Sequence, residues 1–352
     1  MDAKYLKLAL EEALKRKGFT APNPAVGAVV VRNGEFVAAG THWERGKPHA
    51  EVDALLKAGA RAQGATLYVT LEPCNHQGLT PPCTERVLES GIQRVVYAFS
   101  DPNPHVKGGG TLRLRENGVV VERLALPEID AFYQSYARWV TTGRPTVHLK
   151  LAMTLDGKIA GPDGRREKIS GPAFDEFSHL NRRRSDAILT TAQTILNDNP
   201  RFDVRAPVEP CRKRVYVLDS ELRLLPRPDL NVFSHAKELV IFHRGPEERS
   251  RDRARLVAVP RCDDAMDLVT TLKTIGQEGV HDLWVECGAR LTQRLWSLDL
   301  VDEMIIAVAP KFLGPDALAA PGDLSFTGRE VQWRILGDDA ICTVRRHVHR
   351  NC

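Results

Sequence analysis

The sequence lacks the long hydrophobic runs that a membrane-spanning helix requires. No apolar stretch approaches the roughly 18 residues that would cross a bilayer. The first residues, which include Asp2, Lys4 and Lys7, are too polar for the apolar core of a signal peptide. We therefore expect a protein with no membrane partner.

Aromatic residues and an excess of one charge are also scarce. Only 6% of the 352 residues are aromatic, and the formal net charge is +4. A protein that binds single-stranded nucleic acid needs a basic groove interleaved with stacking aromatic side chains. The arginine-rich stretches at 182–184 and 249–255 are more typical of solvated faces. We expect no nucleic-acid partner.

Cysteine is present in a small and odd number, with seven in the chain. Such a count argues against a framework of disulfides and suits a reducing compartment, so we expect a cytoplasmic protein. The chain is longer than the size at which a single hydrophobic core stops growing, and this predicts two domains.

The most informative motif lies within residues 49–83. It consists of His49-Ala50-Glu51, Glu72-Pro73-Cys74 and Pro81-Pro82-Cys83. One imidazole and two thiolates form a zinc ligand set that leaves a position open for water. The pattern matches the H-x-E and P-C-x-x-C signature of hydrolytic deaminases, with a longer spacing between the cysteines. We predict zinc ligands at His49, Cys74 and Cys83, with Glu51 as the unligated carboxylate that moves protons.

The local structure expected around this motif supports the same geometry. The alternating apolar residues of 67–71 predict a strand that Pro73 ends, and the stretch 84–88 predicts a helix. Cys83 would then lie near a helix N-terminus, where the dipole favours a thiolate. We expect the loop at 75–82 to reach over the substrate. The alternative is a closed structural zinc site with His76 as fourth ligand, which leaves Glu51 without a role.

Hydrophobic periodicity predicts two α/β halves. In the first half, an amphipathic helix near residues 6–14 precedes alternating strands and helices, and a helix at 128–139 ends at a linker at 141–145. We expect a three-layer domain at 1–143 and a second α/β domain at 144–352. In the second domain the pattern predicts strands at 146–154, 187–190, 215–218, 239–243, 283–286, 304–309 and 341–347, and helices near 172–183, 265–277 and 289–298.

The second half carries a weaker chemical signature at Trp284-Val285-Glu286, a strand that leads into Cys287-Gly288 and a helix. Backbone N–H groups at such a helix N-terminus can bind a phosphate. The segment lacks the G-x-G-x-x-G of a Rossmann dinucleotide site.

The chain resembles a known family over nearly its whole length. Beside the zinc motif, the residues that carry the resemblance are Asn23-Pro24, Val26-Gly27, Thr70-Leu71, Asp101-Pro102-Asn103-Pro104, Lys150-Leu151-Ala152, Leu155-Asp156-Gly157 and Asp198-Asn199-Pro200. They are similar to the bifunctional pyrimidine deaminase/reductase family of riboflavin biosynthesis. The resemblance implies a cytidine-deaminase-like α/β/α domain followed by a dihydrofolate-reductase-like α/β domain.

The same resemblance implies two consecutive reactions on a small, pyrimidine nucleotide-like substrate. The first is zinc-dependent deamination of a diaminopyrimidinone ribosylamine 5'-phosphate. The second is NADPH-dependent reduction of the ribosyl group to ribityl. We also expect a homo-oligomer.

Carried over position by position, the resemblance also implies binding residues. Those near the deaminase substrate are Asn23, His42, Asp101 and Asn103. Those of the reductase are Lys150, Ala152, Ser170, Thr194, Asp198, Ser220 and Gly288 for the cofactor, and Arg182, Phe202, Arg205 and Glu286 for the substrate.

The sequence departs from the family pattern at a few positions. Leu79 stands where a cation is usual, and losing a contact between a cation and a phosphate costs about 1.5–3 kcal/mol. Lys168 stands where an aromatic residue is usual, Arg166 places a second cation in the same segment, and Cys287 replaces a glycine. A divergent member that deaminates a related pyrimidine in a secondary-metabolite pathway, with a weakened or lost reductase, is therefore an alternative. A nucleic-acid-editing deaminase and a zinc-stabilised interaction protein are alternatives of other classes.

Overall fold

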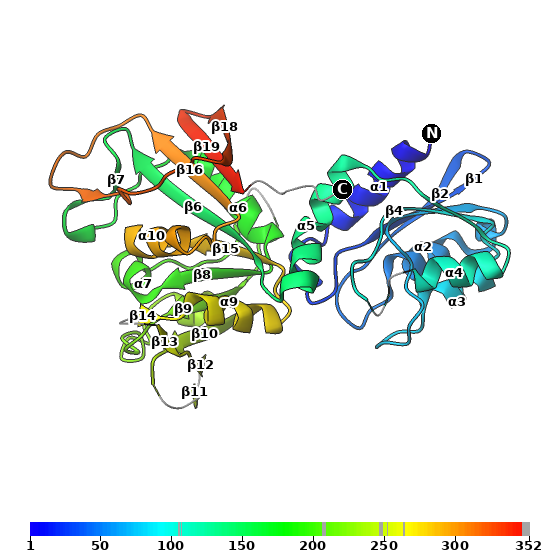
Figure 1. Ribbon diagram of the computed structural model, residues 1–352, viewed down its shortest axis with the longest axis horizontal. Helices are drawn as coiled ribbons and strands as arrows, with labels where there is room; N and C mark the ends of the chain where they lie inside the picture. Colours follow the sequence, from blue (N-terminus) through cyan, green and yellow to red (C-terminus); the bar gives the residue numbers. More distant parts are fainter. Residues whose placement is uncertain are drawn as a thin grey trace. The chain divides into compact units, whose positions relative to one another are not determined.

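The computed structural model describes residues 1–104, 106, 108–205, 209–245, 249–251, 253–262 and 265–346. The chain divides into two compact units (Figure 1). One comprises Met1–Arg144 with Glu278–His281, and the other comprises Pro145–Gln277 with Asp282–Cys352. Among the described residues, no helix is both long and apolar enough to cross a membrane.

The first unit is built on a five-stranded sheet with the strand order β2-β1-β3-β4-β5. β1 is antiparallel to β2 and β3, whereas β3, β4 and β5 are parallel. The strands are β1 (Gly27–Arg32), β2 (Glu35–Thr41), β3 (Thr66–Leu71), β4 (Arg94–Phe99) and β5 (Val120–Arg123). The helices are α1 (Asp2–Leu14), α2 (Ala50–Ala58), α3 (Cys83–Glu89), α4 (Gly109–Glu116) and α5 (Pro127–Thr142), with a short 3-10 helix η1 (Gly59–Ala62).

Helices cover both faces of this sheet because its strands are apolar on both faces. Ala28 and Val30 of β1 pack in one core with residues of α2, α3 and α4. The alternate residues Val29 and Val31 pack in a second core with residues of α1 and α5. Side chains of a strand alternate between its two faces, so a continuously apolar strand needs a cover on each. This confirms the predicted three-layer domain.

Gly40 lets α2 approach the sheet closely. A Cβ at Gly40 would lie 2.2 Å from the carbonyl oxygen of Ala50, the first residue of α2. Only glycine leaves room for this contact. The N-terminal turn of α2, which carries His49 and Glu51, is thereby held against β2.

The second unit contains a ten-stranded sheet with the order β11-β12-β10-β9-β8-β15-β6-β16-β19-β18. Its strands run parallel from β12 to β16, and the outer strands β11, β19 and β18 are antiparallel to their neighbours. Ile188, Val217 and Ile305 belong to a core that also includes Phe174 of the helix α6. This confirms the predicted α/β class of the second half.

The elements of the second unit have the following bounds. The strands are β6 (Thr146–Thr154), β7 (Lys158–Ala160), β8 (Ala187–Thr191), β9 (Arg214–Leu218), β10 (Glu238–His243), β11 (Arg249–Arg251), β12 (Ala254–Ala258), β13 (Arg261–Cys262), β14 (Ala265–Met266), β15 (Asp282–Glu286), β16 (Glu303–Ala309), β17 (Leu318–Ala319), β18 (Arg329–Leu336) and β19 (Asp339–Arg346). The helices are α6 (Pro172–Arg184), α7 (Ala192–Asp198), α8 (Val232–His235), α9 (Leu268–Gln277) and α10 (Ala289–Ser297), with a 3-10 helix η2 (Pro162–Gly164).

Several predicted boundaries were wrong. Thr141 and Thr142 continue α5 rather than opening the linker, and the helix ends at Gly143 in the left-handed region. The stretch at 265–266 is a strand, so the helix predicted from 265 begins at Leu268. Residue 347, which the prediction placed in the last strand, lies outside the described residues.

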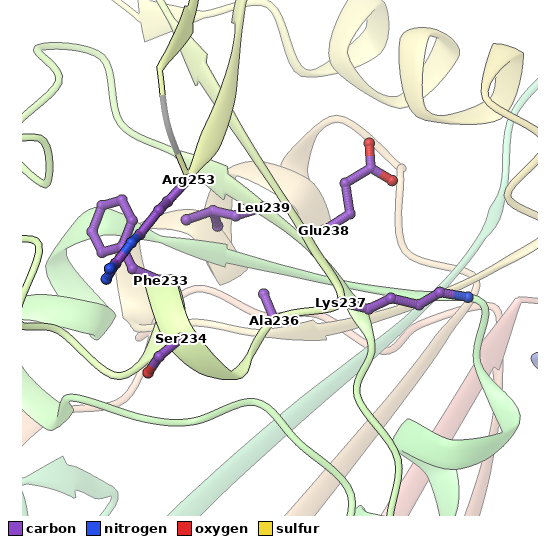
Figure 2. A pocket seen from close by; sticks show the side chains of 7 residues that line it. All are labelled: Phe233, Ser234, Ala236, Lys237, Glu238, Leu239 and Arg253. Atoms are coloured by element: carbon purple, nitrogen blue, oxygen red, sulfur yellow. The ribbon is translucent and has the colours of Figure 1, made fainter.

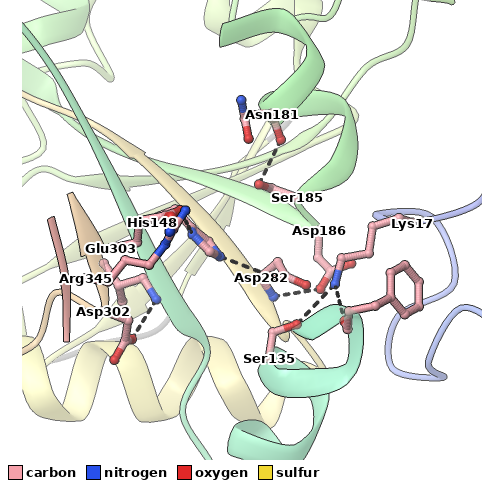
Figure 3. A network of polar contacts seen from close by, with 12 residues as sticks. Lys17, Ser135, His148, Asn181, Ser185, Asp186, Asp282, Asp302, Glu303 and Arg345 are labelled. Carbon is pink, nitrogen blue, oxygen red and sulfur yellow. Dashed lines mark hydrogen bonds and ion pairs between the residues drawn. The ribbon is translucent and has the colours of Figure 1, made fainter. Parts of the chain in front are cut away.

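A partly buried ion network joins four strands of the second unit (Figure 3). His148 of β6 lies between Asp282 of β15 and Glu303 of β16, with Nε2 3.2 Å from Asp282 Oδ1 and Nδ1 2.9 Å from Glu303 Oε2. Arg345 of β19 donates to Glu303 Oε1 at 2.8 Å. Burial alone would lower the pKa of His148, but the two carboxylates raise it to about 10. The network therefore fixes four strands to one another through charge as well as backbone pairing.

Candidate functional site

Three predicted zinc ligands meet in the first unit. The possible ligand atoms of His49, Cys74 and Cys83 all lie within 4.8 Å of one another. His49 Nδ1 lies 3.2 Å from Cys83 Sγ and 3.6 Å from Cys74 Sγ. This nitrogen and these sulfurs are the donors that a tetrahedral zinc site prefers, so the residues fit the metal.

Each ligand is placed by the end of a regular element. His49 is the N-cap of α2, Cys83 is the first residue of α3, and Cys74 follows the end of β3 after Pro73. The backbone N–H of Cys83 donates to Cys74 Sγ at 3.4 Å. The hydrogen bond from the Cys83 thiol lowers the pKa of Cys74, against the opposing effect of burial. A helix N-terminus and its free N–H groups favour thiolates in the same way.

Glu51 lies beside these ligands in the first turn of α2. It is buried, and its carboxyl group shares a hydrogen bond with the Cys83 thiol. Burial raises the pKa of Glu51, which is the direction that a group accepting and releasing a proton near neutral pH requires.

His76 is exposed and is not part of the ligand cluster found among the described residues. The closed site with His76 as fourth ligand is therefore not the arrangement seen.

The predicted deaminase substrate residues form two groups in the first unit, one of which lies beside His49. His42 lies edge-on to His49, with ring centroids 5.1 Å apart. Burial lowers the pKa of His42, and its Nδ1 lies 3.1 Å from the carbonyl oxygen of Pro48. A neutral ring that donates there leaves Nε2 to accept from Asn23 Nδ2 at 3.2 Å. This orients the amide of Asn23.

The second group contains Asp101 and Asn103. The backbone N–H of Asn103 donates to Asp101 Oδ1 at 2.8 Å, and the Tyr136 hydroxyl donates to the same oxygen at 3.2 Å. Burial raises the pKa of Asp101. Tyr136 was not predicted as a site residue, because its position on the apolar face of α5 carries no chemical motif.

The loop between the two cysteines contacts the cluster. Thr80 Oγ1 lies 3.5 Å from His49 Nε2. Leu79, at the preceding position, is 71% exposed. The loop therefore borders the metal cluster, and it presents an apolar side chain to solvent where the family usually has a cation.

A cavity of about 1350 Å³ lies in the second unit. Its lining joins the carboxyl-terminal parts of parallel strands with the start of α10, the arrangement in which open α/β sheets bind ligands. Arg166, Arg223 and Arg290 are among the cations that line it. Acidic residues, among them Asp198, Glu221 and Asp316, line it as well, so its charge is mixed, and its size fits a dinucleotide. Of the predicted reductase residues it is lined by Lys150, Ala152, Ser170, Arg182, Thr194, Asp198, Arg205, Ser220, Glu286 and Gly288.

Phe202 is the predicted reductase residue that does not line this cavity. It is buried in the core, and its backbone has a φ of 52°. The guanidinium of Arg182 lies 5.8 Å from the centroid of its ring. Phe202 therefore lies beside Arg182 within the core.

Arg182 forms a bidentate ion pair with Glu286. Its Nε donates to Oε1 at 2.5 Å and its Nη2 donates to Oε2 at 2.8 Å, while Nη1 donates to the carbonyl oxygen of Asp203 at 3.2 Å. Burial would raise the pKa of Glu286, but Arg182 offsets this and the pKa is about 2. Arg182 therefore already has protein partners.

The three residues of the second unit that depart from the family pattern, Arg166, Lys168 and Cys287, also line the cavity. Lys168 pairs with Asp175, at 2.7 Å from Nζ to Oδ2, so its charge is balanced. Cys287 Sγ lies 3.4 Å from Thr292 Oγ1, and burial raises its pKa to about 12. This thiol is neutral at physiological pH and acts as a small apolar group.

A smaller hollow of about 440 Å³ lies at α8 and the start of β10 (Figure 2). It is lined by Phe233, Ser234, Ala236, Lys237, Glu238, Leu239 and Arg253. None of the predicted site residues lines it, and it contains no group of metal-ligating or nucleophilic side chains.

Comparisons with known proteins agree with both sites. Residues 1–99 match the cytidine and deoxycytidylate deaminase zinc-binding region, and residues 145–343 match the RibD C-terminal domain. The chain is 38% identical to the riboflavin biosynthesis protein RibD of Aquifex aeolicus over 99% of both chains. It is 36% identical to RibD of Escherichia coli, covering 90% of this chain and 89% of the relative.

Solved structures give the same result. The RibD structure of Acinetobacter baumannii has a TM-score of 0.83 at 30% identity and covers 99% of both chains. A diaminohydroxyphosphoribosylaminopyrimidine deaminase/5-amino-6-(5-phosphoribosylamino)uracil reductase from Thermotoga maritima has a TM-score of 0.87 at 31% identity, covering 98% of this chain and 99% of that one.

Fold and site together define a zinc-dependent deaminase joined to an α/β reductase. The chain belongs to the RibD family of bifunctional riboflavin biosynthesis enzymes. This confirms the family resemblance seen in the sequence. It does not favour the alternatives of a secondary-metabolite deaminase, a nucleic-acid editor or a zinc-stabilised interaction protein.

Proposed function

We propose that the chain catalyses two consecutive steps of riboflavin biosynthesis. Residues 1–143 would deaminate a diaminopyrimidinone ribosylamine 5'-phosphate, and residues 144–352 would then reduce the ribosyl group of the deaminated product to ribityl. The observation that carries this proposal is the cluster of His49, Cys74 and Cys83 with the buried carboxyl of Glu51 beside it. The large cavity of the second unit, which Lys150, Asp198 and Glu286 line, supports the reductive step.

In the deaminase, we assign proton transfer to Glu51. His49, Cys74 and Cys83 would hold zinc, which would supply an activated water molecule for attack on the ring carbon that bears the amino group. Glu51 takes the proton that this water loses and delivers a proton to the departing ammonia.

Four further residues would hold the pyrimidine in place during deamination. Asn23, oriented by His42, and Asp101, held by Asn103 and Tyr136, would bind its polar edge.

In the reductase, we assign cofactor binding to the residues of β6, of α7 and of the start of α10 that line the cavity. NADPH supplies the hydride when bound, and the second hydrogen of the reduction is a proton. Lys150 of β6 lines the cavity with Asp198 and Glu286, and we assign the donation of that proton to its ammonium group. Arg205 would bind the substrate phosphate, and the pair of Arg182 and Glu286 would hold the sugar. The remaining cofactor positions are Ala152, Ser170, Thr194, Ser220 and Gly288.

Mass spectrometry of the products tests both steps at once. Purified protein is incubated with the phosphorylated diaminopyrimidinone, with and without NADPH. We expect loss of one nitrogen without NADPH, and loss of one nitrogen plus gain of two hydrogens with it. An unchanged mass with zinc-loaded protein would refute the deaminase assignment, and deamination without any gain of hydrogen would refute the reductase assignment.

We further propose that the chain forms a homo-oligomer through the edge strand β18. Val331, Trp333 and Ile335 are exposed, and their alternate positions place them on one face of the strand. Exposed apolar residues on an edge strand favour association with another chain. Sedimentation should give more than one chain per particle for the wild type and a monomer for Trp333→Glu. The control Leu112→Glu, at an exposed site of α4, should leave the particle size unchanged.

We also propose that the protein works in the cytoplasm. The two cysteine ligands must stay reduced to hold a metal, and the described cysteines Cys74, Cys83, Cys211, Cys287 and Cys342 are all free. Cell fractionation with a tagged chain tests this, because recovery with secreted proteins would contradict it.

A further inference from the structure

His179 is a cavity residue that the sequence did not single out. It lies on α6, only 8% of it is exposed, and it lines the cavity of the second unit together with Arg205. A nearly buried histidine at the wall of a polar cavity needs partners for both ring nitrogens.

The position of the proton on this ring follows from its first partner. The backbone N–H of Arg205 lies 3.3 Å from His179 Nδ1 and points to it as a donor. A backbone N–H can only donate, so Nδ1 accepts. Burial lowers the pKa of His179, and the neighbouring Arg182 and Arg205 lower it further, so the ring is neutral at physiological pH. The neutral ring therefore carries its proton on Nε2.

This proton faces another donor. His179 Nε2 lies 3.4 Å from Nη2 of Arg205. A guanidinium nitrogen has no lone pair to accept with, so two N–H groups lie next to each other without an acceptor between them. Such a pair is suited to share one anionic oxygen, as charge-assisted hydrogen bonds to phosphate do.

Arg205 is also the cation in the better position for a ligand. Its side chain is half exposed and pairs through Nη1 with Asp203 at 3.2 Å. The guanidinium of Arg182, by contrast, is committed to Glu286 and to the carbonyl oxygen of Asp203. Nη1 of Arg205 is therefore occupied by Asp203, and Nη2, which lies beside His179, is the nitrogen that we consider for a ligand.

We propose that His179 Nε2 and Arg205 Nη2 together bind a phosphate oxygen of the molecule that the second unit reduces. This assignment rests on the proposed reductase function, and it adds His179 to the residues that bind the substrate. The phosphate could belong to the sugar of the substrate or to the cofactor. We assign it to the substrate, because the start of α10 at Gly288, a different part of the cavity lining, offers free backbone N–H groups to the cofactor's pyrophosphate.

Two variants of His179 distinguish a role in binding phosphate from a role in maintaining the fold. His179→Leu removes both the acceptor and the donor. His179→Gln keeps both, because its amide oxygen can accept from Arg205 N–H while its NH₂ donates. The matched control is His235→Leu, a histidine of α8 that does not line the cavity.

The variants are compared by steady-state reduction of the deaminated intermediate with and without its phosphate, and by fluorescence titration with NADPH. For His179→Leu we expect the KM of the phosphorylated substrate to rise about 10- to 100-fold, with kcat changed by less than about threefold. The dephosphorylated substrate and the NADPH Kd should not respond. His179→Gln should recover most of the loss.

Other outcomes would overturn the assignment. Equal losses with both substrates would give His179 a structural role, and a weaker NADPH Kd alone would place the phosphate on the cofactor. A wild type that reduces neither substrate would refute the reductase function itself, which is a different failure.

A measurement on the wild type does not depend on variants that fold. Nitrogen NMR of histidine-labelled protein should show His179 protonated at Nε2, with its signal shifting on addition of ribose 5-phosphate. A proton on Nδ1, or no shift at saturating ribose 5-phosphate, would contradict the proposal.

Discussion

At the scale of single residues, Glu51 is the side chain on which deamination depends. Glu51→Gln keeps the size of this buried group and one oxygen that accepts hydrogen bonds, and it removes the ability to carry a proton. We expect deamination to fall by about 10²- to 10⁴-fold, the usual contribution of a positioned proton carrier. Ammonia release measures this, and metal analysis should show an unchanged zinc content. The exposed Glu89→Gln serves as control, and a variant that keeps more than a tenth of the wild-type rate would contradict the role.

Glu286 allows a second prediction at this scale, concerning stability. Glu286→Gln leaves the buried guanidinium of Arg182 without a counter-charge, and breaking such a pair costs about 3–5 kcal/mol. Urea unfolding at pH 7 measures the loss, and the exposed Glu209→Gln should change stability by less than about 0.5 kcal/mol.

The pH dependence of this effect follows from the pKa of Glu286, which is lowered from its ordinary 4.5 to about 2. Because the pKa of Glu286 is lower in the folded state than in the unfolded state, its ionised carboxylate stabilises the fold at pH values above 4.5. This contribution is lost as the pH falls from 4.5 towards 2. The difference between wild type and Glu286→Gln should therefore shrink over that range. A difference that stays constant down to pH 2 would contradict the pairing.

The same scale explains what the sequence could and could not predict. His49, Glu51, Cys74 and Cys83 are found within one short stretch, because the metal chemistry restricts both residue type and spacing. His179 and Tyr136 acquire their significance from Arg205 and Asp101, which are distant in the sequence. No local pattern distinguishes such residues from other members of an amphipathic helix, so only the folded chain brings them to the site.

At the scale of elements, the network around His148 ties β15, β6, β16 and β19 together. His148→Gln leaves two carboxylates facing a neutral group, and we expect it to lower the free energy of unfolding by about 3–5 kcal/mol at pH 6. The pKa of His148 is raised from 6.5 to about 10, so its contribution is complete below pH 6.5 and is lost as the pH rises through 10.

Urea unfolding of both proteins between pH 6 and pH 10 measures this change. The gap between wild type and His148→Gln should close with rising pH. A gap that stays constant would show that His148 carries no charge in the fold, and His235→Gln provides the control for loss of an ordinary histidine.

Elements were predicted best where their apolar pattern is strong. β6 alternates buried and partly buried residues, and its bounds agree with the prediction at 146–154. α7 and β18 were not predicted. The seven residues of α7 are too few to show helical periodicity, and β18 exposes most of its length, so neither carries the buried pattern by which sequence reasoning recognises an element.

At the scale of the whole molecule, each compact unit has its own core, and the proposed activities should be separable. Dialysis against a strong zinc chelator should abolish ammonia release, because the ligands of the first unit then hold no metal. The second unit does not contain these ligands, so NADPH-dependent reduction of the deaminated intermediate should stay within about twofold of its initial rate.

Circular dichroism should show the fold largely retained, since an open catalytic site contributes less to folding than a closed structural one. Added zinc should restore ammonia release. If chelation unfolds the first unit, the metal has a structural role there; if it also stops reduction, the two activities depend on each other.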